Sequence, residues 1–441
     1  MKKNTLDKII NFYIIFTLLT LFINSIFYTY ELINCDILST ILIIIGIAGL
    51  LIYIVYRIKF KINRIWDFLV VIIVFFLYLS YYFAFDKRVA LWGYISGREG
   101  LLVIISYYII FLVASLVSNN SLKDLIIKIL SLFGLVQVFY TFLQIYDIST
   151  IISLPVVGEG FKYGSGFLYN SNFLGTFFVI MCGLWMPKYF FENEKKNSIF
   201  SFIFFLLFLL GILMCGTMSA FVSVIFMFIF NILYLFFRYK QVNLKMFFIK
   251  FIIIMLSILF SNYIMFNLFN SDTGTEISND VVETGQEIVN TVVGEVNENY
   301  GTGRFYIWRE TLKYIPDYLL TGVGIDNFAY LGYEDNTYIY DSSYKWSIVF
   351  KAHNEYMQIL SCEGIFTLLF YIILMGMIFI LSSIKLIKDK KINIIFFSLY
   401  TAFCGYLGQA FFNIRITLLA PIFFIICGLL VSMLKSSKVG K

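Results

Sequence analysis

Long apolar segments separated by short polar ones make up most of this chain, and they constrain its fold more than any other feature of the sequence. Of the 441 residues, 60% are hydrophobic and only 14% are charged. Soluble globular proteins carry about 25% charged residues, and a soluble chain of this size would have to expose much of its apolar surface to water. The sequence therefore excludes a soluble enzyme, a nucleic-acid-binding protein and a disordered protein. It predicts a polytopic protein embedded in a lipid bilayer.

The apolar segments also predict how the chain crosses the membrane. Each is close to the roughly 20 residues that a helix needs to span a bilayer. Backbone groups surrounded by lipid must form their hydrogen bonds within the segment, so an all-α fold is predicted. Twelve transmembrane helices are expected, at 9–30, 37–56, 65–85, 99–117, 125–146, 167–190, 198–215, 217–237, 246–269, 356–384, 392–413 and 417–434.

The distribution of charge predicts the orientation of these helices. With the N-terminus inside, roughly two thirds of the 33 basic residues fall on the cytoplasmic side and most of the 27 acidic residues fall outside, as the positive-inside rule requires. We therefore expect both termini in the cytoplasm and the protein in the cytoplasmic (plasma) membrane. The first segment has basic flanks but no small-residue cleavage site, so we expect a retained span rather than a signal peptide.

One outer loop is far longer than the others. Residues 270–352 separate the ninth and tenth predicted spans, and loops of this length are usually functional or disordered. Hydrophobic periodicity predicts two amphipathic helices in it, at 280–298 and 304–320. The expected organisation is helices 1–9 in residues 1–269, an extracytoplasmic helical loop domain in residues 270–352, and helices 10–12 with a cytoplasmic tail in residues 353–441. The chemistry is expected in the loop.

The single histidine, His353, lies where this loop returns to the membrane. Histidine is the side chain best suited to proton transfer near neutral pH. A polar residue at the entrance of a helix is the alternative interpretation. The rare arginines in the same loop favour the catalytic role.

Arginines are scarce on the outer side, where topology selection disfavours basic residues. Arg304 and Arg309 open the second loop helix, and Arg304 shares a face with Trp308, four residues later. A guanidinium binds phosphate bidentately and keeps its charge. An anion-binding role is therefore favoured for Arg304, whereas an ion pair with Glu310 is favoured for Arg309.

Further polar residues lie near the outer ends of the spans. Arg98, beside Glu99, and Arg415 either bind a substrate or anchor the chain at the membrane interface, where a charge costs less than at the midplane. The uncharged polar residues and one glutamate either line an outward-open cavity or form hydrogen bonds between helices, and hydrogen bonds are favoured for most of them. They are Gln144, Asn170, Ser171, Asn172, Gln358, Glu363, Gln409 and Asn413.

Motifs for nucleotide and metal chemistry are absent from the sequence. It contains no Walker A loop, no serine-nucleophile elbow and no His-Glu-x-x-His. The six cysteines are scattered without a Cys-x-x-Cys pair, so neither a disulfide framework nor a zinc site is indicated. No cofactor and no metal are expected.

Several short runs follow one another in a fixed order in and after the large loop. They are Gly303-Arg304-Phe305-x-x-Trp308, Leu320-Thr321-Gly322-Val323-Gly324-x-x-Asn327-Phe328, and Ala352-His353-Asn354-x-x-x-Gln358 with Glu363-Gly364. Together they resemble the O-antigen ligase / Wzy O-antigen polymerase superfamily of polytopic membrane glycosyltransferases. Two earlier runs add to the resemblance, Gly166-Phe167-x-x-Asn170-Ser171-Asn172, with Ser171 where proline is usual, and Gly97-Arg98-Glu99-Gly100.

The resemblance implies a reaction. The family moves a glycan from undecaprenyl diphosphate to an acceptor hydroxyl outside the cytoplasmic membrane. By resemblance, His353 and Arg304 are catalytic, with His353 taking the proton of the hydroxyl and Arg304 stabilising the diphosphate as its charge grows. The candidate contacts of the diphosphate or sugar are Arg98, Arg415, Trp308, Asn354 and Asn172.

One family feature is missing. Many members carry Ser-Arg where this chain has Ser219-Ala220, and in relatives that arginine is thought to contact the lipid diphosphate. Either Arg98 or Arg415 supplies the charge, or Arg304 works with less help.

Three functions remain open at this point. A polymerase of a surface or capsular polysaccharide is preferred, a ligase that transfers the glycan to a lipid, wall or protein acceptor comes second, and a lipid-linked oligosaccharide flippase or transporter third. The expected partners are the undecaprenyl-diphosphate-linked donor, the glycan or other hydroxyl acceptor, the lipid bilayer and other polysaccharide-assembly proteins, but no nucleic acid.

Overall fold

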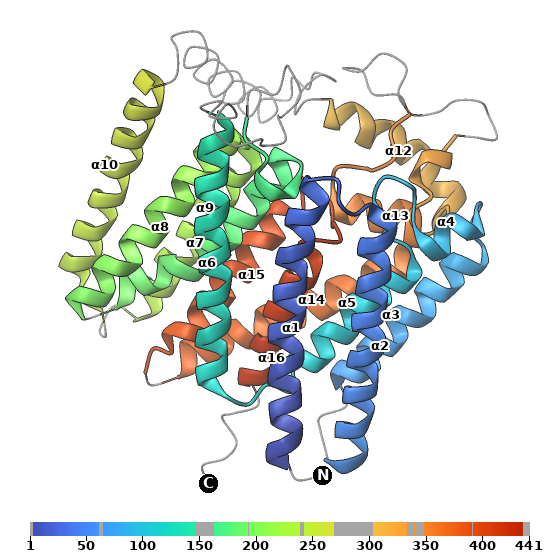
Figure 1. Cartoon of the computed structure of the whole chain (residues 1–441), viewed down its shortest axis with the longest axis horizontal. Coiled ribbons are helices and arrows are strands. Elements are labelled where there is room, and N and C mark those ends of the chain that lie inside the picture. The colour runs from blue at the N-terminus through green and yellow to red at the C-terminus, as the bar shows by residue number, and fades with distance from the viewer. Residues whose placement is uncertain are drawn as a thin grey trace.

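The described part of the chain is a bundle of helices (Figure 1). The computed structural model describes residues 3–60, 65–145, 163–192, 194–238, 242–268, 303–332, 339, 348–389 and 391–434.

Eight of the described helices are long and apolar enough to cross a membrane. They are α1 (Lys3–Thr29), α2 (Cys35–Lys59), α3 (Ile65–Tyr82), α6 (Asn120–Ile145), α7 (Ser171–Phe191), α8 (Lys195–Cys215), α9 (Met218–Arg238) and α14 (Ile365–Lys388). Three apolar helices are shorter, namely α5 (Leu101–Ala114), α15 (Ile394–Gln409) and α16 (Ala420–Leu434). These findings confirm the all-α polytopic membrane fold, while the count of twelve spans stays a prediction.

The remaining elements lie between or after these helices. They are α4 (Lys87–Trp92), η2 (Gly166–Leu168), α10 (Leu244–Leu268), α12 (Arg304–Tyr318), η4 (Phe328–Tyr330) and α13 (Glu355–Glu363). The predicted loop helix at 304–320 is observed as α12. The predicted loop helix at 280–298 lies outside the described residues, as does much of the predicted loop domain, so the division of the chain into three parts stays a prediction.

The predicted span 356–384 is two helices rather than one, because the chain breaks at Gly364. This glycine has φ +85°, and a Cβ there would lie 2.3 Å from the carbonyl oxygen of Leu320. The loop segment that follows α12 occupies the break: Ile365 N–H donates to Leu319 C=O at 2.8 Å, and Val323 N–H donates to Ser361 C=O at 2.9 Å. The break separates α13 from α14 and lets both ends of the break bond to the segment that follows α12.

The core of the bundle lies around α7, whose residues from Leu174 to Pro187 are all buried. This helix packs against α6, α8, α9 and α15, and α16 packs against α5. Most residues of the short helices α5, α15 and α16 are buried, so these helices are largely enclosed by other helices. α12 and α13 lie together at one end of the bundle, whereas α1 begins and α16 ends at the other (Figure 1).

The contact between α7 and α15 depends on a glycine. A Cβ at Gly183 would lie 2.4 Å from Cα of Ala402, whereas a Cβ at Gly376 of α14 would meet nothing within 4 Å. We expect Gly183→Ala to force the two helices apart and cost about 1–3 kcal/mol of stability, and Gly376→Ala to be neutral or slightly stabilising. The midpoint of thermal unfolding of the detergent-purified variants checks this, and equal midpoints for the two would contradict it.

Candidate active site

The turn that carries His353 is held on both sides. Before it, Ala352 N–H donates to Oε1 of Gln358 at 2.7 Å, and after it, Oδ1 of Asn354 accepts from Met357 N–H at 3.0 Å and caps α13. His353 itself has φ +51°, in the left-handed region that few non-glycine residues occupy. Such conformations persist only where the surroundings impose them, and they are frequent at active sites.

The helix α12 lies against this turn. Nε1–H of Trp308 donates to the carbonyl of Ala352 at 2.9 Å. Arg304 lies one helical turn before Trp308 on the same face of α12. The structure thus brings Trp308 to the turn of His353 and Asn354, and Arg304 lies on the same face of α12. The Trp308 indole also packs against Phe305, with ring centroids 5.4 Å apart, as expected of a residue in the small core of the loop.

Arg304 differs from the other described arginines. It is partly buried, yet no described residue forms a hydrogen bond or ion pair with it. Burial lowers the pKa of its guanidinium, but arginine remains charged at neutral pH. It stands at the first turn of α12, which no side chain caps in the described part of the chain. A cation at an uncapped helix N-terminus is suited to bind an anion.

The two other candidate arginines have carboxylate partners. Arg98 is in the left-handed conformation, pairs with Asp36 and donates from Nη1 to the carbonyl of Gly93 at 3.2 Å. Arg415 is 4% exposed and pairs with Glu363, the last residue of α13. Their charges are therefore compensated within the protein.

Arg415 nevertheless lies close to the candidate site. Glu355 N–H, two residues after His353, donates to the carbonyl of Ala410 at 2.8 Å, so the segment between α15 and α16 lies against the start of α13. In the same segment, Nδ2 of Asn413 donates to the carbonyl of Asn172 at 3.0 Å. That bond brings the first turn of α7 and the candidate Asn172 to this end of the bundle.

A buried cluster of charged side chains lies next to the turn and includes Lys351, two residues before His353. Nζ of Lys351 lies 2.5 Å from a carboxylate oxygen of Asp326 and 3.4 Å from one of Glu99. Asp326 also accepts from Tyr94 N–H at 2.6 Å, and Glu99 accepts from the Tyr107 hydroxyl at 3.0 Å. Burial alone lowers the pKa of the Lys351 ammonium, but the two carboxylates outweigh it and the pKa lies above its ordinary value.

Sequence reasoning missed most of this cluster. Lys351 stands two residues before His353 in the predicted outer loop, where the predicted candidates are arginines and the histidine. Glu355 was missed as well, although both of its carboxylate oxygens accept from buried tyrosines, Tyr371 at 2.7 Å and Tyr406 at 3.0 Å. Charged residues close to the single histidine could have indicated both residues, because the chain has few charges.

Other polar residues form bonds between segments, as the favoured interpretation predicted. Gln144 accepts from Gly166 N–H at 2.9 Å, and Gln409 joins Ser219 and Ser223 of α9 at 2.9 and 3.0 Å. In α12, Arg309 pairs with Glu310 as predicted, and Lys313 pairs with the same glutamate at 2.6 Å.

The comparison with known families identifies part of this arrangement. Residues 203–372 match the family model described as O-Antigen ligase. This region of the chain is similar to the O-antigen ligase family. The resemblance found in the sequence is thereby confirmed, and the matched region contains Arg304, Trp308, His353 and Asn354 but not Arg98, Asn172 or Arg415. No curated protein matches the chain.

Family and fold together define the protein coarsely. It is a multi-pass membrane protein that contains an O-antigen ligase-type region. In the part of the chain that the structure describes, no group of three or more His, Cys, Asp or Glu side chains is arranged to hold a metal ion.

The ion cluster should be essential for stability. Lys351→Met leaves the Asp326 and Glu99 carboxylates buried without their cation, and we expect a loss of about 3–5 kcal/mol. The control Lys313→Met removes a lysine whose side chain is 59% exposed in an ion pair, and its cost should stay below about 1 kcal/mol. Thermal unfolding of both variants in the same detergent measures the difference. Equal stabilities would show that Lys351 does not hold the cluster together.

Proposed function

We propose that this protein transfers a glycan from an undecaprenyl-diphosphate-linked donor to an acceptor hydroxyl outside the cytoplasmic membrane, as the polymerase of a surface polysaccharide of the O-antigen type. One observation carries the proposal. Arg304, a partly buried cation without a partner among the described residues, lies on the face of α12 that contacts the turn of His353.

Arg304 would hold the diphosphate of the donor. When the bond between the anomeric carbon and the diphosphate oxygen breaks, negative charge grows on the leaving diphosphate. A fixed guanidinium and the N–H groups at the start of α12 stabilise that charge more in the transition state than in the ground state. Diphosphate is a good leaving group, so the transfer needs no nucleotide.

His353 would act on the acceptor. Its imidazole takes the proton of the attacking hydroxyl while the hydroxyl oxygen forms the new bond to the anomeric carbon. Direct displacement of this kind inverts the anomeric centre. The hydrogen bonds at Ala352 and Asn354 fix the turn, so the imidazole is carried on a rigid support.

The other candidates keep supporting roles in the proposal. Asn354 caps α13 and Trp308 binds the carbonyl before His353, so both orient the histidine turn. Asn172, Arg98 and Arg415 are proposed to line the rim of the donor site, where Arg415 would act through its pair with Glu363.

An apolar groove next to the site suits the lipid part of the donor. It has a volume of about 470 Å³ and is lined by aromatic side chains of α9, α13, α14 and the segment after α15, together with Cys404, Leu407 and Gly408 of α15. Tyr356, three residues after His353, borders the groove and donates from its hydroxyl to the carbonyl of Leu407 at 3.0 Å. Phe226 and Phe411 on its border are 46% and 54% exposed, so the groove opens towards lipid. A polyprenyl chain could lie there with its diphosphate near α13.

The position of buried charge favours transfer over transport. Transporters place charged residues near the middle of their spans. In the described ranges, the buried charged residues lie in connecting segments or near helix ends instead, namely Glu99, Lys123, Arg238, Lys250, Asp326, Lys351, Glu355, Glu363 and Arg415.

A ligase is the second candidate, and the description of the matched family favours it. Polymerase and ligase share the donor, the diphosphate site and the base. They differ in the acceptor, which is another lipid-linked glycan for the polymerase and a different hydroxyl-bearing molecule for the ligase.

Removing either proposed catalytic group should abolish most of the activity. We expect His353→Ala to lower transfer from a labelled lipid-linked donor by about 10²–10⁴-fold, the usual contribution of a general base. Arg304→Ala should lower it by about 10²–10³-fold, as for other groups that stabilise transition-state charge. Arg309→Ala, on the same helix and paired with Glu310, is the matched control. Near wild-type activity of His353→Ala and Arg304→Ala, at equal membrane abundance, would refute the proposal.

The product distinguishes polymerase from ligase. Purified protein given only the lipid-linked repeat unit should produce a ladder of longer glycans that remain on undecaprenyl diphosphate. Gel electrophoresis of the lipid-extracted products shows whether the ladder forms. If no ladder forms, and the glycan moves only when a separate acceptor is added, the ligase assignment replaces the polymerase.

A further inference from the structure

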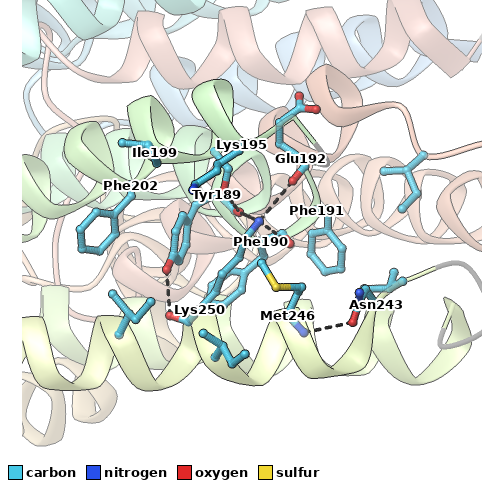
Figure 2. Close-up of a pocket in the computed structure, with 15 residues that line it drawn as sticks. Tyr189, Phe190, Phe191, Glu192, Lys195, Ile199, Phe202, Asn243, Met246 and Lys250 are labelled. Atoms are coloured by element: carbon cyan, nitrogen blue, oxygen red, sulfur yellow. Dashed lines mark hydrogen bonds between the residues drawn. The ribbon is translucent and has the colours of Figure 1, made fainter.

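A second pocket lies away from the candidate active site (Figure 2). It has a volume of about 530 Å³, within the range of about 300–1,000 Å³ found for small-molecule sites. The end of α7 and the first turns of α8 and α10 form it, and most of its lining is apolar. None of the residues considered for catalysis contributes to it.

The pocket lies between α8 and α10, and each helix lines it with residues of one face. On α8 the lining residues are Lys195, Ser198, Ile199 and Phe202, and on α10 they are Met246, Ile249, Lys250 and Ile253. Both sets follow the spacing of one helix face. One face of α8 and one face of α10 therefore line the same space, and an elongated apolar group could fill it.

The buried polar groups of the pocket already form hydrogen bonds with one another. Nζ of Lys250 donates to the carbonyls of Tyr189 at 2.6 Å and Glu192 at 3.2 Å, and so caps the end of α7 (Figure 2). The hydroxyl of Tyr189 in turn donates to the carbonyl of Lys250 at 3.0 Å. The cation available to a ligand is instead Lys195 at the rim, which is exposed.

The pocket and the candidate site lie at opposite ends of α7, and this predicts that they face opposite leaflets. The first turn of α7 carries Asn172 beside Asn413, and its last turn forms the pocket. Between them runs a helix of 21 residues, about 30 Å long at 1.5 Å per residue, which is the thickness of the hydrocarbon core. The charge distribution predicts that the pocket end faces the cytoplasm.

We propose that this pocket binds an anionic glycerophospholipid of that leaflet, with one acyl chain between α8 and α10 and its phosphate at Lys195. The opening is bordered by residues that face lipid, since Ile199, Ile249 and Ile253 are 50%, 40% and 41% exposed. With Lys195, the exposed Lys196 and Lys245 outnumber the two acidic residues nearby in sequence, Glu192 of the lining and the exposed Glu194. Basic clusters next to an apolar groove between spans are typical of sites for anionic lipids.

The test compares lipids that differ only in headgroup. The full-length protein, purified in a neutral detergent, is titrated with phosphatidylglycerol or phosphatidylcholine of identical acyl chains, or with inorganic phosphate, and its thermal unfolding is followed. We expect phosphatidylglycerol to raise the midpoint in a saturable manner and the other two ligands to leave it nearly unchanged. Equal stabilisation by both lipids, or by phosphate alone, would overturn the proposal.

Two pairs of variants separate headgroup and chain binding. Lys195→Glu should weaken phosphatidylglycerol binding about fivefold or more, because one lysine near an anionic headgroup contributes about that factor, while Lys59→Glu at the end of α2 should not. Ile249→Trp fills the pocket and should abolish the stabilisation, whereas Ile252→Trp, exposed on the same helix but outside the lining, should retain it. Unchanged binding in Lys195→Glu and Ile249→Trp would exclude this pocket as the lipid site.

Discussion

The ammonium of Lys351 between the carboxylates of Asp326 and Glu99 is the interaction on which the site end of the bundle depends. All three side chains are buried, and a buried charge without a partner costs several kcal/mol. Each of the three therefore holds the other two in place. Because they come from the segment before α5, the segment after α12 and the residue just before the His353 turn, the cluster joins three parts of the chain that lie far apart in sequence.

Charge pairing around the site also determines which cation remains for a ligand. Six buried charged residues surround the turn, four acidic (Glu99, Asp326, Glu355, Glu363) and two basic (Lys351, Arg415). Their salt bridges involve both cations. In the proposed reaction, the surplus of carboxyl groups would oppose the diphosphate of the donor, so the charge that attracts it would have to come from outside this set. Among the described residues near the turn, Arg304 on α12 meets that requirement.

The sequence predicted the parts of this protein that depend on local pattern. Apolar length placed the described spans, and helical periodicity located α12 within two residues of its observed end. The break at Gly364 was not predictable in this way, because the residues on both sides are apolar and the break depends on hydrogen bonds from the segment after α12. The ion pairs were hidden for a related reason: Lys351 and Glu99 are 252 residues apart, and Arg415 and Glu363 are 52 apart. Pairing over such distances follows from packing and cannot be read from spacing.

The family arginine that this chain lacks bears on where the positive charge for the proposed diphosphate site could come from. At the position expected to carry it, Ala220 is completely buried, and the neighbouring Ser219 and Ser223 share the amide of Gln409. A guanidinium at Ala220 would enter a closed contact between α9 and α15 in which the polar groups already satisfy one another, and its desolvation would be costly. Arg304 avoids that cost, because it stands at the start of a loop helix and is only partly buried. In the proposed reaction, a chain that closes α9 against α15 would supply the phosphate-binding charge from α12, where Arg304 has no partner among the described residues.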